Sequence, residues 1–441
     1  MLPDLALLEI FYFYVDQNKA RVEAWHTLVH VCRKWRNVVF GSPRRLNLRL
    51  RCTESTPVRE TIDAWPLLPI LVSGSGSETW SADNIIAALE HNDRICDLHL
   101  FGVTSSQMEK VFAATHQSFP ALQNLQIISS SIDETSVVPA LFSGGSAPQL
   151  RSLWLDSIPF PGLPKLLLSA THLVTLHLHD IPHSGYFSPE AMITALSALT
   201  SLGSLEIKFK SPRSRPDWRR HPPPLTRTLL LALTWFQFKG VSEYLEDLVV
   251  RIDAPLLGSL DITFFHQLIF DTPQLTQFIS RTSKFKTCDN ARVQFLNRGV
   301  RISTSDGALK LAISCRQSDW QLSSLAQVCG SIFIPAIEHL YIREDTHSSL
   351  SWHDDIETGQ WLELLHRLPA VKDLHISRKF IPRIAPTLEE LVRGRVTEVL
   401  PALQTLFLEE TLPSGVQETI DKFVAARELA GHPIAVSSWK P

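Results

Sequence analysis

One short phrase returns along most of the chain, and it constrains the fold more than any other feature. The phrase runs Pro, one residue, an apolar residue, two residues, Leu, one residue and a last apolar residue. FPALQNLQI from Phe119 and LPALQTLFL from Leu400 are two copies. Its apolar–x–x–Leu–x–apolar part recurs from Ile95 to Leu408, mostly at intervals of about 23 to 34 residues. Such a period is typical of stacked structural repeats.

The residues of the phrase predict what each repeat forms. Alternation of apolar and polar residues at its end predicts a strand with one buried face. The proline ends the preceding helix, since it lacks an N–H group. Helix-like segments such as 188–199 lie between the copies. We therefore expect an α/β fold in which parallel strands form one face of a solenoid and helices form the other.

A doubly wound α/β sheet is the alternative, because it also alternates strands and helices. Its strands are covered on both faces and read as continuous apolar runs. The strands of this chain instead carry His, Asp, Trp, Glu and Lys at every second position. The pattern resembles a leucine-rich repeat over about residues 95–415, in the longer form with helices on the convex side. The resemblance implies a concave face, made by the strands, that binds a partner.

Residues that flank the buried leucines of each strand should point to that concave face. Aromatic side chains mixed with histidine and charge are typical of the centre of a protein-binding surface. The alternative is that loops or neighbouring side chains cover some of these aromatic residues. The residues expected to bind a protein substrate are Phe101, Trp154, His177, His179, Trp235, Tyr341, Arg343, His375 and Phe407.

The first 45 residues form a different unit. LPDLALLEIFYFYV continues from its Leu-Pro start as an apolar helical pattern, and a second helical region follows in RVEAWHTLVHVCRKWRNVVFGSP. Together they resemble the F-box, a three-helix module that binds a Skp-type adaptor. An F-box followed by leucine-rich repeats is similar to the large F-box family of basidiomycetes, the mushroom-forming fungi. The residues that match the motif, and that the resemblance implies bind the adaptor, are Leu2, Pro3, Leu7, Ile10, Phe11, Leu28, Val31, Cys32 and Trp35.

The resemblance implies a non-catalytic substrate-recognition subunit of a cullin-based ubiquitin ligase. The F-box would bind the adaptor and the repeats would bind a protein substrate. The N-terminal helices have an alternative role, because the open end of a solenoid needs a cap. In that case the chain would be a repeat-based binding scaffold without a ubiquitin role.

These patterns divide the chain into four parts. We expect an F-box in 1–45, a linker and N-terminal cap in 46–94, repeats in 95–415, and a capping helix and strand in 416–441. Ser73–Ser77, with the sequence SGSGS, is interpreted as a flexible link. A basic, proline-rich loop near 208–227 interrupts the repeats. The number of repeats between 263 and 335 stays open.

Composition argues against several other classes of protein. A net charge of −3 gives the chain no electrostatic reason to bind nucleic acid or an anionic membrane. Its apolar runs are shorter than the roughly 18 residues that span a bilayer. The 6 cysteines form no CxxC pair, so we expect buried thiols in a reducing compartment, the cytoplasm or the nucleus. Nothing supplies a nucleophile, a base and an orienting group together, so neither catalytic residues nor a cofactor are expected.

Two histidine patterns resemble metal sites. His26 and His30 have helical spacing but lie inside the F-box pattern, and Thr27 stands where a zinc protease has glutamate. His177 and His179, with His183 nearby, could hold zinc but lack an obvious fourth ligand. A polar concave strand is the favoured interpretation, and no metal is expected.

Overall fold

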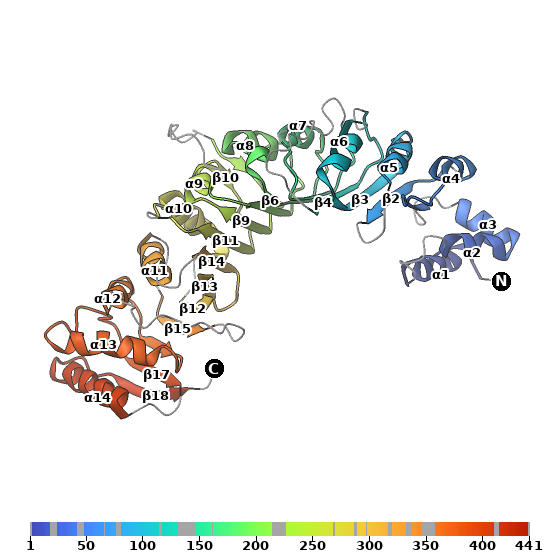
Figure 1. The fold of residues 1–441 in the computed structure, drawn as a ribbon. Helices are drawn as coiled ribbons and strands as arrows, with labels where there is room; N and C mark the ends of the chain where they lie inside the picture. The colour runs from blue at the N-terminus through green and yellow to red at the C-terminus, as the bar shows by residue number, and fades with distance from the viewer. Residues whose placement is uncertain are drawn as a thin grey trace. The chain divides into compact units, whose positions relative to one another are not determined.

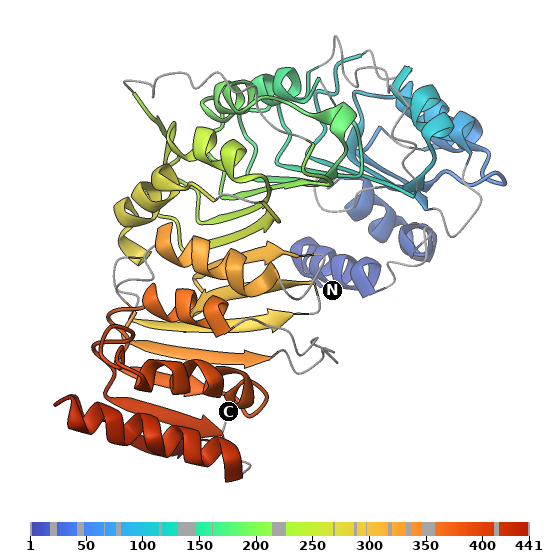
Figure 2. The ribbon, with the colours of Figure 1, turned by 60° about the vertical axis from the view of Figure 1, so that its left-hand side comes forward.

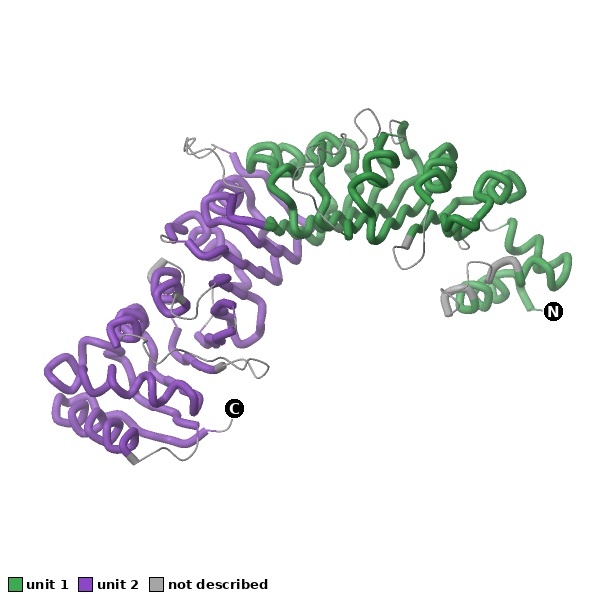
Figure 3. Tube along the Cα trace, in the orientation of Figure 1, with its two compact units in different colours: residues 1–210 green, residues 211–441 purple. Residues whose placement is uncertain are grey.

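The structure is a computed structural model. It describes residues 2–17, 24–41, 48–65, 67–75, 81–113, 117–130, 146–160, 162–213, 226–267, 270–285, 289–296, 298–315, 320–331, 337–344, 358–409 and 414–439. The chain divides into two compact units, residues 1–210 and 211–441, coloured separately in Figure 3. Among the described residues, no helix is both long enough and apolar enough to cross a bilayer.

The first unit contains three N-terminal helices and then a parallel sheet. Its strand order is β1-β2-β3-β4-β5-β6-β7, so each strand lies beside the strand that precedes it in the chain. Its elements are α1 Asp4–Gln17, α2 Ala24–Val31, α3 Arg33–Phe40, β1 Leu48–Arg51, α4 Val58–Ala64, β2 Ile70–Ser75, α5 Ala82–Leu89, β3 Ile95–Val103, α6 Ser105–Ala113, β4 Asn124–Ser129, β5 Ser152–Asp156, α7 Leu163–Ser169, β6 Thr175–Ile181, η1 His183–Gly185, α8 Pro189–Leu196 and β7 Ser204–Phe209.

The leucines of the repeated phrase lie side by side across this sheet. Strands β3 to β7 pair in parallel, and the central leucine of each copy pairs with that of the next. These leucines are all buried, which explains why the phrase must return in every repeat: Leu98, Leu125, Leu153, Leu176 and Leu205. Helices α4 to α8 lie along one side of these strands (Figure 1). The prediction of a parallel strand–helix array is confirmed.

The array begins earlier than predicted. Residues 46–94 were expected to be a linker and cap, but they contribute β1 and β2, which extend the parallel sheet. Ser73 and Gly74, expected in a flexible link, lie inside strand β2. The prediction was wrong because neither strand carries a full copy of the phrase. The alternation of Leu48 and Leu50, both buried, was the available signal.

The second unit continues the same strand–helix alternation. Its elements are β8 Thr228–Leu229, β9 Trp235–Gly240, α9 Ser242–Val249, β10 Ile252–Asp253, β11 Ser259–Phe265, α10 Pro273–Arg281, η2 Ser283–Phe285, β12 Asn290–Leu296, β13 Gly299–Thr304, β14 Leu309–Ser314, α11 Trp320–Ser331, β15 His339–Glu344, α12 Thr358–His366, β16 Asp373–Ile376, α13 Ile381–Val392, β17 Thr405–Glu409, α14 Ser414–Leu429 and β18 Ala435–Trp439. The strand order of its large sheet is β9-β11-β14-β13-β12-β15-β16-β17-β18. Figure 2 shows helices along one side of these strands.

An antiparallel meander interrupts the parallel order in this unit. Strand β13 pairs antiparallel with both β12 and β14, while β14 pairs in parallel with β11 and β12 pairs in parallel with β15. The sheet therefore stays continuous although the chain runs through these three strands in reverse spatial order. This meander lies between residues 263 and 335, the stretch for which the sequence did not predict the number of repeats.

Both ends of the predicted array can now be placed. The expected C-terminal helix and strand are α14 and β18, and β18 pairs in parallel with β17. At the N-terminus the expected three helices are present as α1, α2 and α3. Of the predicted loop 208–227, residues 214–225 lie outside the described residues.

Candidate functional site

The side of the strands away from the helices of the repeats, called the open face from here on, carries alternate residues of each repeat. All nine side chains predicted to bind a substrate lie on this face and are half-buried, and each lies next to a buried residue of its strand. They are Phe101 on β3, Trp154 on β5, His177 and His179 on β6, Trp235 on β9, Tyr341 and Arg343 on β15, His375 on β16 and Phe407 on β17. In each unit the structure brings some of them into direct contact.

In the second unit, three aromatic rings stack across adjacent strands. Tyr341, His375 and Phe407 occupy the same position in successive copies of the phrase, and the strand register pairs them directly. The Tyr341 and His375 rings lie 4.1 Å apart at 16°, and the His375 and Phe407 rings lie 4.1 Å apart at 2°. Trp439 on β18 meets the stack edge-on, 5.3 Å from His375. These four residues form the aromatic ladder.

Sequence reasoning missed Trp439. Strand β18 carries no copy of the phrase. The only available signal was that Ala435, Ser437 and Trp439 occupy alternate positions of a predicted capping strand, which places them on one face. The Trp439 Nε1 group donates a hydrogen bond of 3.4 Å to the carbonyl oxygen of Ile376, which fixes the indole over the ladder. Strand β18 therefore also contributes to the open face.

The electrostatics around the ladder leave its rings neutral. Burial lowers the pKa of His375, so its imidazole is uncharged at neutral pH. On the same face, His339 Nδ1 lies 2.7 Å from Asp373 Oδ2. A neutral aromatic surface beside polar groups suits an apolar side chain of a partner, held within polar surroundings.

In the first unit, five polar and aromatic residues form the histidine cluster. It consists of Trp154, His177, His179, Glu206 and Lys208. The Trp154 ring lies 5.1 Å from the ring of His177 and 5.0 Å from the ring of His179. The Glu206 carboxylate, only 3% exposed, is 2.8 Å from His179 Nε2 and also contacts the Lys208 ammonium.

Neighbouring groups lower the pKa of the buried Glu206 carboxyl. Burial on its own would raise the pKa of Glu206, but hydrogen bonds from His179 and Lys208, together with their charges, lower it overall. Burial lowers the pKa of His177, so this imidazole is neutral at neutral pH. Glu206 follows the buried Leu205 on β7, and the structure places it at the centre of the cluster. His183, which the sequence suggested as a partner of the two histidines, does not belong to it.

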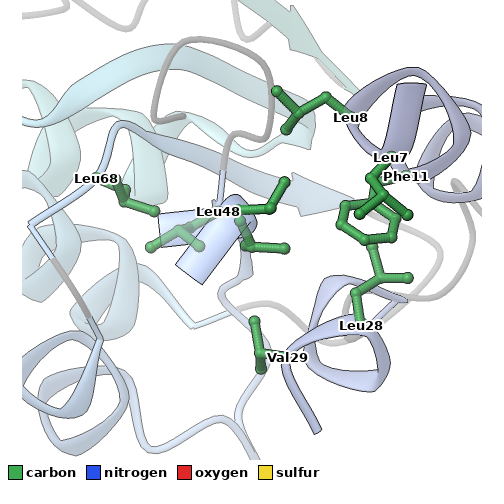
Figure 4. Packing of buried hydrophobic residues seen from close by; sticks show 9 residues of the cluster. Leu7, Leu8, Phe11, Leu28, Val29, Leu48 and Leu68 are labelled. Carbon is green, nitrogen blue, oxygen red and sulfur yellow. The ribbon is translucent and has the colours of Figure 1, made fainter. Parts of the chain in front are cut away.

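At the N-terminus, the residues predicted to bind an adaptor fall into two groups. Leu7, Phe11 and Leu28 are buried in the core of the three helices, which extends to Leu48 and Leu68 (Figure 4). Their predicted role in contact with an adaptor is therefore wrong, because they pack inside the module. Trp35 is half-buried, with its ring 4.7 Å from that of Phe11.

The other predicted residues are exposed: Leu2, Pro3, Ile10, Val31 and Cys32. Cys32 was expected to be a buried thiol. Instead it precedes α3 as its N-cap, and its Sγ accepts a hydrogen bond from the Trp35 N–H at 3.4 Å. Cys52, Cys96, Cys315 and Cys329 are buried as expected, and Cys288 lies outside the described residues.

Large apolar side chains gather on the outside of this helical module. The exposed fractions run from 49% to 69% in the set Leu2, Leu5, Ile10, Tyr12, Phe13 and Val31. We call these six residues the apolar patch. Leu5, Tyr12 and Phe13 were missed because the motif match named only the other three. The signal was present, since α1 is apolar on all sides and only one side can face the core.

Comparisons with known proteins add little to this geometry. No protein-family model matches the chain, and no curated protein matches its sequence. Among solved structures, the chain is similar to the leucine-rich repeat-containing protein LegL7 from Legionella pneumophila. The match has 12% sequence identity and a TM-score of 0.27, and it covers 85% of this chain and 97% of that chain. A likeness at this level carries no functional argument, so the proposals below rest on the chain's own residues.

Proposed function

We propose that the chain is a non-catalytic substrate receptor of a cullin-based ubiquitin ligase. The N-terminal helices would bind a Skp-type adaptor, and the open face of the leucine-rich repeats would hold a protein substrate. The ligase chemistry would belong to other subunits, in the cytoplasm or the nucleus. The observation that carries this proposal is the apolar patch.

The patch supports adaptor binding because the module does not need it for folding. Leu7, Leu8 and Phe11 already supply the buried side of α1. Tyr12 and Phe13 follow Leu5 by seven and eight positions, which is about two helical turns. All three side chains face away from that core. Exposed apolar side chains grouped on one side of a helix indicate a binding site for another protein. A groove that receives an amphipathic helix would match its shape.

The open face supports the second half of the proposal. Aromatic side chains are enriched among the residues that dominate binding energy at protein interfaces. The aromatic ladder presents such side chains on rigid strands, which lowers the entropy that binding must overcome. A folded partner or an extended segment with an apolar anchor would fit a surface of this kind.

A pull-down with a purified Skp-type adaptor tests the adaptor half. The wild-type chain should retain the adaptor, and the double variant Leu5→Glu, Phe13→Glu should lose it, because two charges would be buried at the contact. Trp35→Ala is a poorer test, since Trp35 packs on Phe11 and its loss would disturb the module. Leu429→Glu is the matched control: Leu429 is 90% exposed but lies on α14, so this variant should bind like wild type.

A second candidate function rests on a different observation. The core of the N-terminal helices includes Leu48 of β1 and Leu68, so the module covers the first strand of the array. This favours a capping role, in which the chain would be a protein-binding scaffold without a link to ubiquitin. Failure of the folded wild-type chain to retain the adaptor would contradict the ligase proposal and leave the scaffold.

A further inference from the structure

We propose that His177, His179 and Glu206 form a binding site for a divalent cation of the zinc class on the open face of the first unit. Each residue offers one ligand atom, and these atoms all lie within 4.8 Å of one another. This site is separate from adaptor binding and does not depend on it. It also departs from the expectation from the sequence, which favoured a polar concave strand without a metal.

The parallel register of β6 and β7 creates the site. His177 and His179 are two residues apart on β6, so both side chains lie on the open face. His177 pairs with Glu206 on β7, which brings the carboxylate beside both imidazoles. Sequence reasoning could not supply this third ligand, because Glu206 lies in the next repeat and only the register brings it there.

The distances fit a shared cation. Zinc bonds of about 2.0–2.2 Å in tetrahedral geometry place ligand atoms roughly 3.3–3.6 Å apart. Glu206 Oε2 lies 2.8 Å from His179 Nε2 and 3.8 Å from His177 Nδ1. These two separations lie on either side of the tetrahedral value, so small side-chain rotations would bring all three atoms onto one ion.

Neighbouring groups already orient two of the ligands. Ser204 Oγ is 3.0 Å from His177 Nε2, and this hydrogen bond leaves the Nδ1 side of the ring turned toward Glu206. Lys208 contacts Glu206 Oε1, which leaves Oε2 toward the histidines. Bonds of this kind to the far side of a ligand are typical of metal sites, where they fix the ligand's direction.

The donor set indicates the kind of ion. Two imidazoles and one carboxylate suit zinc and its neighbours in the transition series, whereas calcium and magnesium prefer oxygen ligands only. Three protein ligands leave a fourth position for water or for a side chain of a bound partner. The half-buried Trp154 ring lies against both histidines and would shield one side of the ion.

The competing explanation is that Lys208 is the only cation the cluster needs. Its ammonium group contacts Glu206 and neutralises the carboxylate in the absence of any metal. Lys208→Met distinguishes the two explanations. If the metal site exists, removal of a positive charge beside the ion should tighten zinc binding severalfold.

The experiment is a calorimetric titration of zinc chloride into the metal-free full-length chain. We expect one binding event that His179→Ala, His177→Ala and the conservative Glu206→Gln each weaken at least about tenfold. His99→Ala is the matched control: His99 is a half-buried histidine of the same face, on β3, and its loss should leave the affinity unchanged. Circular dichroism confirms that each variant is folded.

Two results would overturn the proposal. One is a folded wild-type chain that binds no zinc. The other is zinc binding that is equally strong in wild type, His179→Ala and Glu206→Gln, which would assign the ion to other histidines. Tighter binding by Lys208→Met, together with losses in the three ligand variants, would establish the site.

Discussion

Ring contacts across three strands hold the aromatic ladder, and His375 is its central member. His375→Ala should leave a gap between Tyr341 and Phe407 and lower the stability of the second unit by about 1 kcal/mol. His375→Phe keeps a flat ring at that position, so it should retain both the stability and the proteins that co-purify with the chain. Denaturant unfolding and comparison of the co-purified proteins measure the two effects. Equal losses in both variants would contradict a role based on stacking.

The packing of helix α14 also depends on a single side chain, that of Arg427. Arg427 is 0% exposed, and its guanidinium donates hydrogen bonds to the carbonyl oxygens of Val396, Leu400, Leu403 and His432. Arg427→Met would remove all four bonds, of which those to Leu400 and Leu403 are buried. We expect a loss of about 3 kcal/mol in the free energy of unfolding.

The matched control for Arg427 is Lys422→Met on the same helix. Lys422 forms an exposed ion pair with Glu418 at 2.8 Å, and such pairs contribute little to stability. The control should therefore unfold like wild type. An Arg427→Met chain that unfolds at the wild-type denaturant concentration would show that the four hydrogen bonds do not hold the cap.

Individual residues of the open face were largely predictable from the sequence. Side chains alternate along a strand, so the position of a residue in the phrase predicted whether it would lie in the core or on the open face. Copies of the phrase align in register, and the neighbours Tyr341, His375 and Phe407 follow from that alignment. Trp439 and the buried Arg427 could not be predicted in this way, because their partners are set by the packing of segments that lack the phrase.

Helix α10 depends on a carboxylate supplied by another helix. Its N-cap residue, Thr272, makes no side-chain capping bond. Glu246 of α9 accepts hydrogen bonds from the backbone N–H groups of Gln274 and Leu275, each at 2.8 Å. Burial raises the pKa of Glu246 from 4.5 to about 7, even though these two bonds lower it.

This shift predicts a pH dependence of stability. The folded chain keeps the Glu246 proton up to about pH 7, whereas the unfolded chain loses it near 4.5. Stability should therefore be greatest below the unfolded value and fall as pH rises from 4.5 to about 7, by up to ~3 kcal/mol. Glu246→Gln should remove this part of the slope. Unfolding of both chains at about pH 5 and about pH 8 measures it, and parallel slopes would contradict the assignment.

The elements of the array were predictable to different degrees. Strands that carry the phrase were located correctly because each must bury the same leucines against its neighbours. The meander of β12, β13 and β14 was not, since its strands pair antiparallel and lack the phrase. Alternation alone predicts a strand but not the direction of its partner. The early strands β1 and β2 were missed for a similar reason.

We propose that the whole chain binds partners through two kinds of surface. The N-terminal helices carry the apolar patch, and the strands of each unit carry aromatic and histidine residues on the open face. Trp154→Ala combined with Tyr341→Ala should reduce the set of co-purified proteins without loss of adaptor binding. The reverse pattern is expected for Leu5→Glu with Phe13→Glu. If each double variant lost both kinds of partner, the division of roles would be wrong.

Hydrogen exchange of the full-length chain, measured with and without a saturating Skp-type adaptor, tests the proposed adaptor binding. We expect slower exchange of backbone amides in α1, α2 and α3 when the adaptor is present, with exchange in the repeat strands unchanged. Unchanged exchange in all three helices would contradict it, and the N-terminal module would then be a cap on a binding scaffold.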